Sequence, residues 1–352
     1  MRFAHLANHF GGDYRHLIVA MNGATGAVGR LAPNLDARVI DVPIRRGETL
    51  ANLRTFRRVL GEIRPDLLVT SNWGSIEWAL ANLDGRVRHL HMEDGFGPEE
   101  ARRQLPRRVW TRRLALARST VLLPSETLYR IARHVWRLPE RRLAYVPNGI
   151  DCARFRGAAD PAFAAAMGIR ADVPVIGTVA ALRPEKNLHR LIDAFAELAQ
   201  HRPAQLVLVG DGAERPALEA RAASLGLRDQ VLFTGACATP EKLLPAFTVF
   251  ALSSDTEQMP LSVLEAMAAG RPIAATDVGD VRRMLAEDNR AYVVEPDTGR
   301  LAISMRSLLD APGRAAIGAA NAARAREAYD QNVMFGAYRT LYDGKPLRQS
   351  PP

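Results

Sequence analysis

The chain has 352 residues, of which 47% are hydrophobic and 24% charged, a composition typical of a folded protein with room for two domains. It has no run of about eighteen apolar residues, which argues against a membrane-spanning helix, and its start lacks the pattern of a signal segment. The two cysteines, Cys152 and Cys237, are far apart and show no metal-ligand spacing, so no disulfide framework is expected. We therefore expect a cytoplasmic protein.

The net charge of +9 is unevenly distributed. Residues 1–150 hold 24 arginines and 14 acidic residues, whereas the remainder is close to neutral. Seven of these arginines lie in residues 102–118, RRQLPRRVWTRRLALAR. Such a segment suits an anionic membrane surface or a phosphorylated ligand, and it equally suits a solvated helix in a chain with only three lysines. No nucleic acid is expected as a partner, because the segment has one aromatic residue, Trp110, and no nucleic-acid motif.

Short apolar runs alternate with amphipathic stretches through the first half. Residues 2–10 have helical character, and residues 11–16 are expected to end that helix before a strand. Because a doubly wound domain begins with a strand, we expect this domain either to lack its first strand or to be unusual. The predicted strands lie at 16–21, 66–70, 87–92 and 120–125, and the predicted helices at 49–63 and 75–83. This alternation predicts parallel strands joined by crossover helices.

The turn-rich segment YVPNGID (145–151) predicts a boundary between domains at 1–150 and 151–330. The alternation restarts after it, with apolar runs at 175–182, 204–212, 230–235, 243–254, 272–279 and 292–296. Helical patterns lie at 186–201, 216–226 and 301–343. Residues 331–352 are expected to form a terminal helix and tail that return to the first domain. The sequence thus predicts an α/β protein of two doubly wound domains facing across a cleft, with ligands at the carboxyl ends of strands.

A basic pair occupies the loop ALRPEKNL (181–188), between a strand and a helix. Arg183 and Lys186 there can neutralise a diphosphate leaving group together with the N-terminus of the helix. A basic pair in a loop is, however, more often simply exposed charge. Both interpretations stay open on these residues alone.

Glycines end the next apolar run, LVLVGDG (206–212). Gly210 and Gly212 permit close approach of a ligand to the backbone, or form an ordinary turn. VLFTG (231–235) ends another strand at the same edge, where a nucleobase can stack or the strand simply terminates. Each signal is weak by itself.

The stretch TEQMPLSVLEAMAAG (256–270) places Glu257 in a loop and Glu265 in a small-residue helix. Pro260 suits the first turn of that helix, and the free amides between Met259 and residue 262 are expected to face a phosphate or sugar. A carboxylate accepts hydrogen bonds from two adjacent hydroxyls. We therefore predict that Glu257 contacts a sugar and that Glu265 contacts both hydroxyls of a ribose.

Together, these features resemble the donor domain of retaining glycosyltransferases with the GT-B fold, in the large family numbered four. The resemblance covers residues 120–340 well and the first domain loosely. It rests on VAALRPEKN, LVGDG, VLFTG, EQMPLSVLE and EAMAAGRP, preceded by PNGID and Phe155.

The resemblance implies a role for each matching residue. Arg183 and Lys186 hold the donor diphosphate, and Met259, Pro260 and Leu261 present backbone groups to the phosphates or sugar. Glu257 and Glu265 keep the roles given above. Members of the family commonly have Gly-Phe-Gly or a similar small pair after the first glutamate, whereas this chain has Gln258 and Met259. That departure leaves the donor sugar open.

Paired carboxylates follow a predicted strand of the first domain in HMEDGFGPEE (91–100). Family members often carry a histidine or His-Asp at this place, where this chain has Glu93 and Asp94. We predict that these two bind the acceptor hydroxyl or assist as a base, with helix capping as the alternative. His91 is either an acceptor-side residue or a packed core histidine, and Asn72 is a further acceptor-side candidate.

The resemblance implies transfer of a sugar, with retention, from a UDP- or GDP-linked donor to a glycan or lipid-linked acceptor. The expected setting is polysaccharide or lipopolysaccharide synthesis, with residues 102–118 on the anionic inner face of the membrane. The scheme requires no metal and no cofactor. The alternatives are a nucleotide-sugar epimerase of similar fold and a truncated, non-catalytic nucleotide-binding homologue.

Overall fold

The computed structural model describes residues 2–23, 26, 28–96, 98–100 and 103–347. Their contacts divide the chain into two compact units. Unit 1 comprises Met1–Val146 and Phe335–Pro352, and unit 2 comprises Pro147–Met334. The division therefore falls slightly before the expected boundary at residue 150, and the second division falls inside helix α13 (Gln331–Tyr342).

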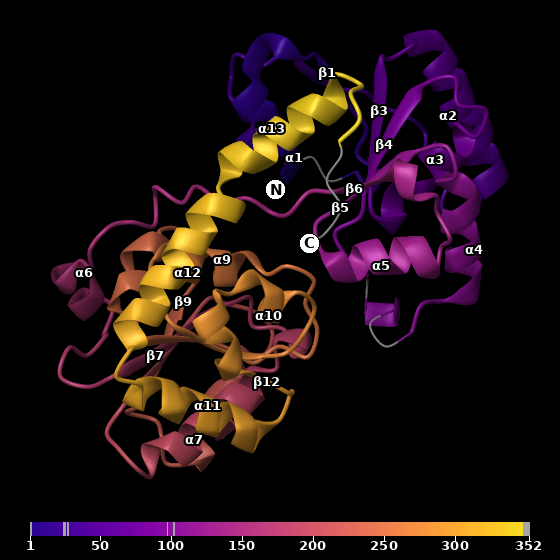
Figure 1. The fold of residues 1–352 in the computed structure, drawn as a ribbon. Helices are drawn as coiled ribbons and strands as arrows, with labels where there is room; N and C mark the ends of the chain where they lie inside the picture. Colours follow the sequence, from indigo (N-terminus) through magenta and orange to yellow (C-terminus); the bar gives the residue numbers. More distant parts are fainter. Residues whose placement is uncertain (1, 24–25, 27, 97, 101–102, 348–352) are drawn as a thin grey trace. The chain divides into compact units, whose positions relative to one another are not determined.

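Unit 2 is built on a six-stranded parallel sheet with the order β12-β11-β10-β7-β8-β9 (Figure 1). The strands are β7 Val175–Val179, β8 Gln205–Val209, β9 Val231–Gly235, β10 Val249–Leu252, β11 Ile273–Thr276 and β12 Val293–Val294. Counted along the chain within the unit, this is the 3-2-1-4-5-6 order of doubly wound folds. The winding direction reverses between β7 and β10, which is where ligands bind in such sheets.

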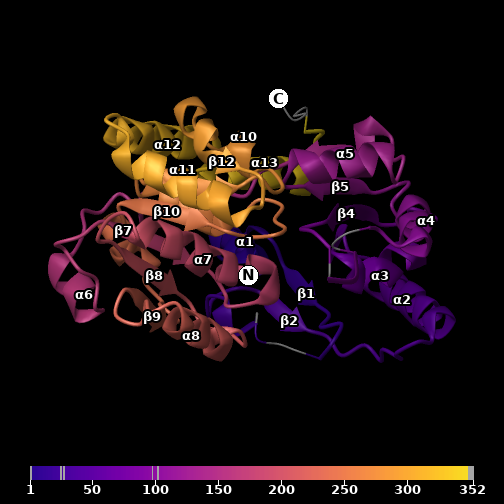
Figure 2. The ribbon, with the colours of Figure 1, turned by 90° about the horizontal axis from the view of Figure 1, so that it is seen from below.

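Helices cover both faces of this sheet (Figures 1 and 2). One face packs against α7, α8 and α11, and the other against α9, α10 and α12. Because both faces are covered, β8 is buried along its whole length. The helices are α6 Pro161–Ala166, α7 Leu188–Ala199, α8 Arg215–Ser224, α9 Leu261–Ala268, α10 Val281–Met284, α11 Thr298–Asp310 and α12 Arg314–Ala328.

Unit 1 contains a four-stranded parallel sheet with the order β3-β4-β5-β6. A separate parallel pair, β1 with β2, forms a second small sheet. The strands are β1 His16–Ile18, β2 Ala37–Val39, β3 Leu67–Ser71, β4 Arg88–Met92, β5 Thr120–Leu123 and β6 Leu143–Tyr145. The helices are α1 Arg2–Phe10, α2 Thr49–Ile63, α3 Ile76–Ala81, α4 Pro106–Ala115 and α5 Glu126–His134, with the end of α13.

Aromatic packing joins the first and last helices of unit 1. The His9 ring stacks on Phe335 with centroids 3.6 Å apart, and Phe10 packs at 5.7 Å from Tyr342. The Arg88 guanidinium donates to the carbonyl of Leu341 at 2.7 Å. These contacts hold the residues of α13 from Phe335 onward in unit 1, although they lie far from α1 in sequence.

Some helices and strands are shorter than predicted because proline or glycine residues interrupt them. The helix predicted at 49–63 forms with those bounds as α2, but the pattern at 301–343 forms three helices. α11 ends at Asp310, just before Pro312 and Gly313. The apolar run at 243–254 yields a strand only from Val249 onward, because Pro245 lies in a short 3-10 turn. α4, α5 and β6 were not predicted as separate elements.

The two thiols are free, with Cys152 buried and Cys237 partly buried. None of the helices in the described part of the chain is both long and apolar enough to cross a bilayer. Within the described ranges, no three His, Cys, Asp or Glu side chains are grouped as a metal ion requires.

Candidate functional site

A cation, a hydroxyl and a carboxylate meet at the carboxyl ends of β7 and β10, where the winding of the unit 2 sheet reverses. Lys186 follows β7, and Ser254 and Glu257 follow β10. Nζ of Lys186 donates to Oε1 of Glu257 at 2.6 Å, and the Ser254 hydroxyl donates to the same oxygen at 2.8 Å. The Lys186 and Glu257 side chains are 24% and 10% exposed, so the pair is shielded but still reachable from solvent.

Side chains tie the loop after β7 to the loop after β10. Asn187 adopts the left-handed conformation with φ 41°, and its side chain caps α7 by accepting from the amide of Arg190 at 3.2 Å. The same side chain donates to the Asp255 carboxylate at 3.1 Å, which Arg190 also contacts at 2.7 Å. The Ser253 hydroxyl donates to the carbonyl of Lys186 at 3.0 Å. Lys186 is therefore held in place by backbone and cap contacts on both sides.

The second predicted cation, Arg183, lies at the start of the same loop. Its side chain is 67% exposed, and its guanidinium is 4.0 Å from the Glu185 carboxylate. A pair at that distance and exposure contributes little to stability. The structure thus fixes Lys186 and leaves Arg183 extended in solvent, where its long side chain can still reach a ligand.

The loop that carries Glu257 rests on the backbone of Gly279 and Asp280, two residues that the sequence analysis did not identify. Gly279 has φ +57°, and a Cβ there would lie 2.3 Å from the carbonyl oxygen of Glu257. Only glycine fits this approach. The amide of Asp280 donates to the carbonyl of Gln258 at 3.0 Å. The available signal was the VGD sequence shortly after the end of β11, at the same edge of the sheet.

Met259 is held inside unit 2 by Asn148, a residue of the PNGID segment. Its side chain is buried, and its carbonyl accepts from Nδ2 of Asn148 at 3.0 Å. Its sulfur accepts from the backbone amide of Asn148 at 3.2 Å. The carbonyl of Met259 is therefore occupied within the protein. Pro260 occupies the N-cap position of α9 with φ −69°, and Leu261 is 43% exposed, so their predicted backbone roles remain sterically open.

Glu265 lies on α9 among different neighbours from Glu257. Burial raises the pKa of the Glu265 carboxyl to about 7, a rise that Arg154 opposes and Glu241 reinforces. Arg154 and Glu241 are themselves paired at 2.7 Å. The two glutamates of the motif therefore differ in their partners.

The predicted glycines after β8 are required by the packing of the loops. A Cβ at Gly210 would lie 1.8 Å from the carbonyl oxygen of Ala180, and one at Gly212 would lie 2.3 Å from that of Leu182. The loops after β7 and β8 thus pack backbone against backbone. This packing explains both glycines, and their contact with a donor remains a prediction.

A buried polar chain runs along β4 in unit 1. His89, His91 and Glu93 alternate along the strand and the residue after it, so they share one face of the sheet, and all three are buried. The Thr70 hydroxyl lies 2.8 Å from Nε2 of His89 and 2.7 Å from Nδ1 of His91. The Ser119 hydroxyl lies 2.7 Å from Nδ1 of His89. His91 is thus a packed core histidine, the second of its two predicted alternatives.

Glu93 belongs to a buried ion-pair cluster. Its side chain is 0% exposed and accepts from Nε of Arg112 at 3.3 Å. Arg112 also pairs with both oxygens of Glu100, at 3.1 and 3.0 Å. The Arg112 guanidinium lies over three aromatic rings, those of Trp73, Phe96 and Trp136. The Glu93 carboxylate is therefore enclosed in the interior and paired with a cation, and its catalytic role stays a prediction.

Asp94 and Asn72 lie together at the carboxyl ends of β4 and β3. The Asp94 side chain is 38% exposed and pairs with Arg2 at 2.5 Å. Its amide donates to the side-chain oxygen of Asn72 at 2.7 Å, and the Asn72 amide donates to the carbonyl of Met92 at 2.8 Å. The two carboxylates that the sequence analysis paired therefore separate, with Glu93 facing the interior and Asp94 facing solvent.

Within the arginine-rich segment, α4 covers Pro106–Ala115. Arg103 precedes the helix and Arg118 follows it, and Arg102 lies outside the described residues. Arg108 and Arg112 turn inward to carboxylates. Two apolar residues of α4 face solvent, Trp110 with 66% and Leu114 with 59% of the residue exposed. The segment is thus neither a uniformly solvated helix nor a uniformly basic surface.

Two family models match the chain, Glycosyltransferase Family 4 at residues 3–154 and Glycosyl transferases group 1 at residues 161–326. The chain belongs to the group 1 glycosyl transferases. Alpha-D-kanosaminyltransferase of Streptomyces kanamyceticus is 33% identical over 147 residues, which are 40% of this chain and 38% of that protein. D-inositol 3-phosphate glycosyltransferase of Rhodococcus jostii is 29% identical over 272 residues, 74% of this chain and 59% of that protein. The match therefore spans less than two thirds of either relative.

Solved structures of glycosyltransferases share the GT-B fold of this group 1 member. A glycosyltransferase from Rickettsia africae superposes with a TM-score of 0.80 at 16% identity, covering 96% of this chain and 91% of that one. Anabaena HepE in complex with UDP superposes with a TM-score of 0.76 at 21% identity, covering 93% and 92%. The predicted fold class, two doubly wound domains of the GT-B type, is confirmed.

Replacing Arg112 by alanine is expected to lower the free energy of unfolding of unit 1 by about 3–5 kcal/mol, because it leaves two buried carboxylates without their cation. All four tryptophans lie in unit 1, so tryptophan fluorescence during urea unfolding reports on this unit. Arg113→Ala on the same helix is the matched control, with an expected change within about 0.5 kcal/mol. Equal losses in the two variants would show that the cluster does not stabilise the unit.

Proposed function

We propose that the protein is a retaining glycosyltransferase that moves a sugar from a UDP- or GDP-linked donor to a hydroxyl of a glycan or lipid-linked acceptor. The observation that carries the proposal is the Lys186–Glu257 pair at the point where the winding of the unit 2 sheet reverses. Membership of the group 1 family supports transferase chemistry. HepE structures hold UDP and UDP-glucose, which supports a nucleoside diphosphate sugar as the donor.

Cleavage of the donor bond leaves negative charge on a nucleoside diphosphate. The Lys186 ammonium is partly desolvated and already oriented, so it stabilises that charge without reorganising. Arg183 supplies a second cation from solvent. Both described hydrogen bonds of Glu257 fall on Oε1, so its Oε2 is the oxygen offered to a hydroxyl of the donor sugar.

Glu265 is assigned to the ribose. A carboxylate on a helix can accept from two adjacent hydroxyls, and desolvation strengthens those bonds once the ligand has displaced water. The raised pKa means that the ionised form is costly in the empty site. Ribose hydroxyls would therefore stabilise the ionised Glu265 carboxylate by donating hydrogen bonds to it.

On the acceptor side, Asp94 is the exposed carboxylate and Asn72 the neighbouring amide. Asp94 is proposed to orient the acceptor hydroxyl or assist its deprotonation. Because Arg2 pairs with Asp94, the acceptor must share or displace that guanidinium. The proposed setting is synthesis of cell-surface polysaccharide or lipopolysaccharide on the cytoplasmic side.

Lys186→Gln is expected to reduce kcat/KM by about 10²–10³-fold, because it removes a preorganised charge from the leaving group. The assay measures acceptor-dependent release of nucleoside diphosphate from a panel of UDP- and GDP-sugars. Lys242→Gln, which lies elsewhere in unit 2 over the ring of Phe163, is the matched control and should retain activity. Formation of an epimer of the donor without any acceptor would contradict the transferase proposal and favour an epimerase.

Binding of the nucleotide sugar is expected to weaken by about tenfold from pH 8 to pH 6, because the ribose requires ionised Glu265 and protonation competes below its pKa of about 7. Both phosphates of a nucleotide sugar are esterified, so the ligand itself does not titrate there. The measurement is calorimetric titration with whichever of the UDP- and GDP-sugars shifts Tm.

Glu265→Gln is the matched variant for this pH dependence. It should bind more weakly at pH 8 and show little change between pH 6 and pH 8. An unchanged pH dependence in Glu265→Gln would show that another group titrates in this range, and it would reject the ribose role of Glu265.

We further propose that α4 docks on the anionic inner face of a membrane. Trp110 and Leu114 lie one turn apart and exposed, and the Arg113 guanidinium lies 5.2 Å from the centroid of the Trp110 ring. Arg107 is exposed on the same helix. An interfacial helix combines such apolar residues with basic ones, which attract anionic headgroups.

The double substitution Trp110→Ala/Leu114→Ala is expected to abolish cosedimentation with vesicles that contain phosphatidylglycerol, while vesicles of phosphatidylcholine alone bind neither protein. Binding of the unaltered protein should fall as salt rises, because headgroup attraction is screened. Ile303→Ala/Val333→Ala removes two similarly exposed apolar residues of unit 2 and is the control. Equal binding by both double variants would exclude α4 as the docking surface.

A further inference from the structure

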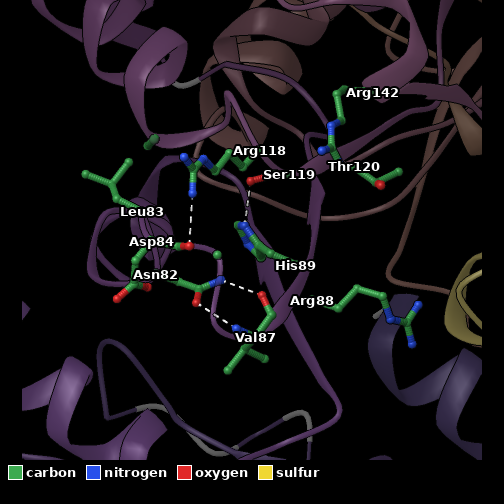
Figure 3. A pocket seen from close by; sticks show the side chains of 12 residues that line it. Asn82, Leu83, Asp84, Val87, Arg88, His89, Arg118, Ser119, Thr120 and Arg142 are labelled. Carbon is green, nitrogen blue, oxygen red and sulfur yellow. Dashed lines mark hydrogen bonds between the residues drawn. The ribbon is translucent and has the colours of Figure 1, made fainter.

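A pocket opens in unit 1 at the amino ends of β4 and β5 (Figure 3). Its volume is about 260 Å³. The proposed acceptor residues Asn72 and Asp94 lie at the other, carboxyl ends of the strands in this sheet. The pocket therefore belongs to neither the donor site nor the acceptor side.

Three arginines line the pocket, and two of them have guanidinium groups available to a ligand. Arg88 is committed to the carbonyls of α13, whereas Arg118 makes one hydrogen bond, from Nη1 to the carbonyl of Asp84 at 3.0 Å. Within the described chain, the Arg142 guanidinium makes no hydrogen bond or ion pair. The Asp84 carboxylate is compensated by Arg57 and Arg86, at 2.8 and 2.7 Å. The pocket is thus an electropositive cavity.

The buried floor of the pocket is formed by His89 and Ser119, the first members of the polar chain along β4. The Thr70 hydroxyl lies within hydrogen-bond distance of both histidine rings, 2.8 Å from Nε2 of His89 and 2.7 Å from Nδ1 of His91. The Ser119 hydroxyl lies 2.7 Å from Nδ1 of His89. A hydroxyl has one donor and two acceptor sites, so Ser119 can still form a hydrogen bond with a hydroxyl group of a ligand.

We propose that this pocket binds a small phosphate monoester that also carries a hydroxyl group. Figure 3 shows Arg118 and Arg142 on either side of Ser119, so the phosphate lies between the guanidiniums and the ligand hydroxyl forms a hydrogen bond with Ser119. Guanidinium groups bind phosphate oxygens in two parallel hydrogen bonds. The volume is slightly below the roughly 300 Å³ at which ligand pockets usually begin, which suits a phosphate with a short polyol. The proposal does not depend on the transferase reaction.

The test is titration with glycerol 3-phosphate, followed by NMR signals of the histidine rings. Burial lowers the pKa of His89 to about 3, so its ring stays neutral at pH 7 and a shift reports the altered Ser119 contact. We expect a saturable shift of the His89 signals. Arg142→Gln should weaken binding at least tenfold, whereas Arg141→Gln, the neighbouring arginine outside the pocket, should change it less than twofold.

Further titrations distinguish binding in this pocket from binding at other phosphate sites. Arg118→Gln should also weaken binding, and Lys186→Gln, which alters the donor site, should leave the His89 response intact. Inorganic phosphate should bind more weakly than glycerol 3-phosphate, and glycerol alone should produce no shift. Equal titrations of Arg142→Gln and Arg141→Gln, or binding without any movement of the His89 signals, would overturn the proposal.

Discussion

The ion pair between Lys186 and Glu257 joins the loops that follow two neighbouring parallel strands, β7 and β10. In a doubly wound sheet, the chain leaves the two strands at the reversal toward opposite faces. Here Asn187, Asp255 and Ser253 link the loops, so the cation and the carboxylate are in place before any ligand arrives. This preorganisation matters because a charge that is already in position stabilises an opposite charge without the cost of moving the surrounding groups.

The carboxylates of this chain show that surroundings, rather than residue type, decide their chemistry. Glu257 is compensated by a neighbouring ammonium, whereas burial raises the pKa of Glu265 to about 7. Glu93 is enclosed with Arg112, and its sequence neighbour Asp94 remains half-exposed beside Arg2. The exposed or partly exposed members of this set are Glu257, Glu265 and Asp94, and these are the carboxylates to which the proposed function assigns roles.

Features set by local backbone patterns could be predicted from the sequence, and those set by distant partners could not. α2, the strands of unit 2 and the loop of Lys186 follow from apolar periodicity and turn residues. Glu93 and Asp94 look equivalent in sequence, but strand alternation continues the buried face of β4 to Glu93, and Arg112 makes that burial possible. Likewise, nothing local to Met259 indicates that Asn148 holds it.

Helix α4 buries an arginine beside its apolar residues Val109 and Ala115, which pack against the core of unit 1. Arg108 and Arg112, one turn apart, face the interior, while Trp110 and Leu114, also one turn apart, face solvent. Burying a guanidinium requires compensation, and the interior carboxylates and aromatic rings supply it. Stability alone would favour the reverse placement, with the indole inside and the guanidiniums outside. The indole instead lies at the surface of unit 1, with the Arg113 guanidinium 5.2 Å from the centroid of its ring.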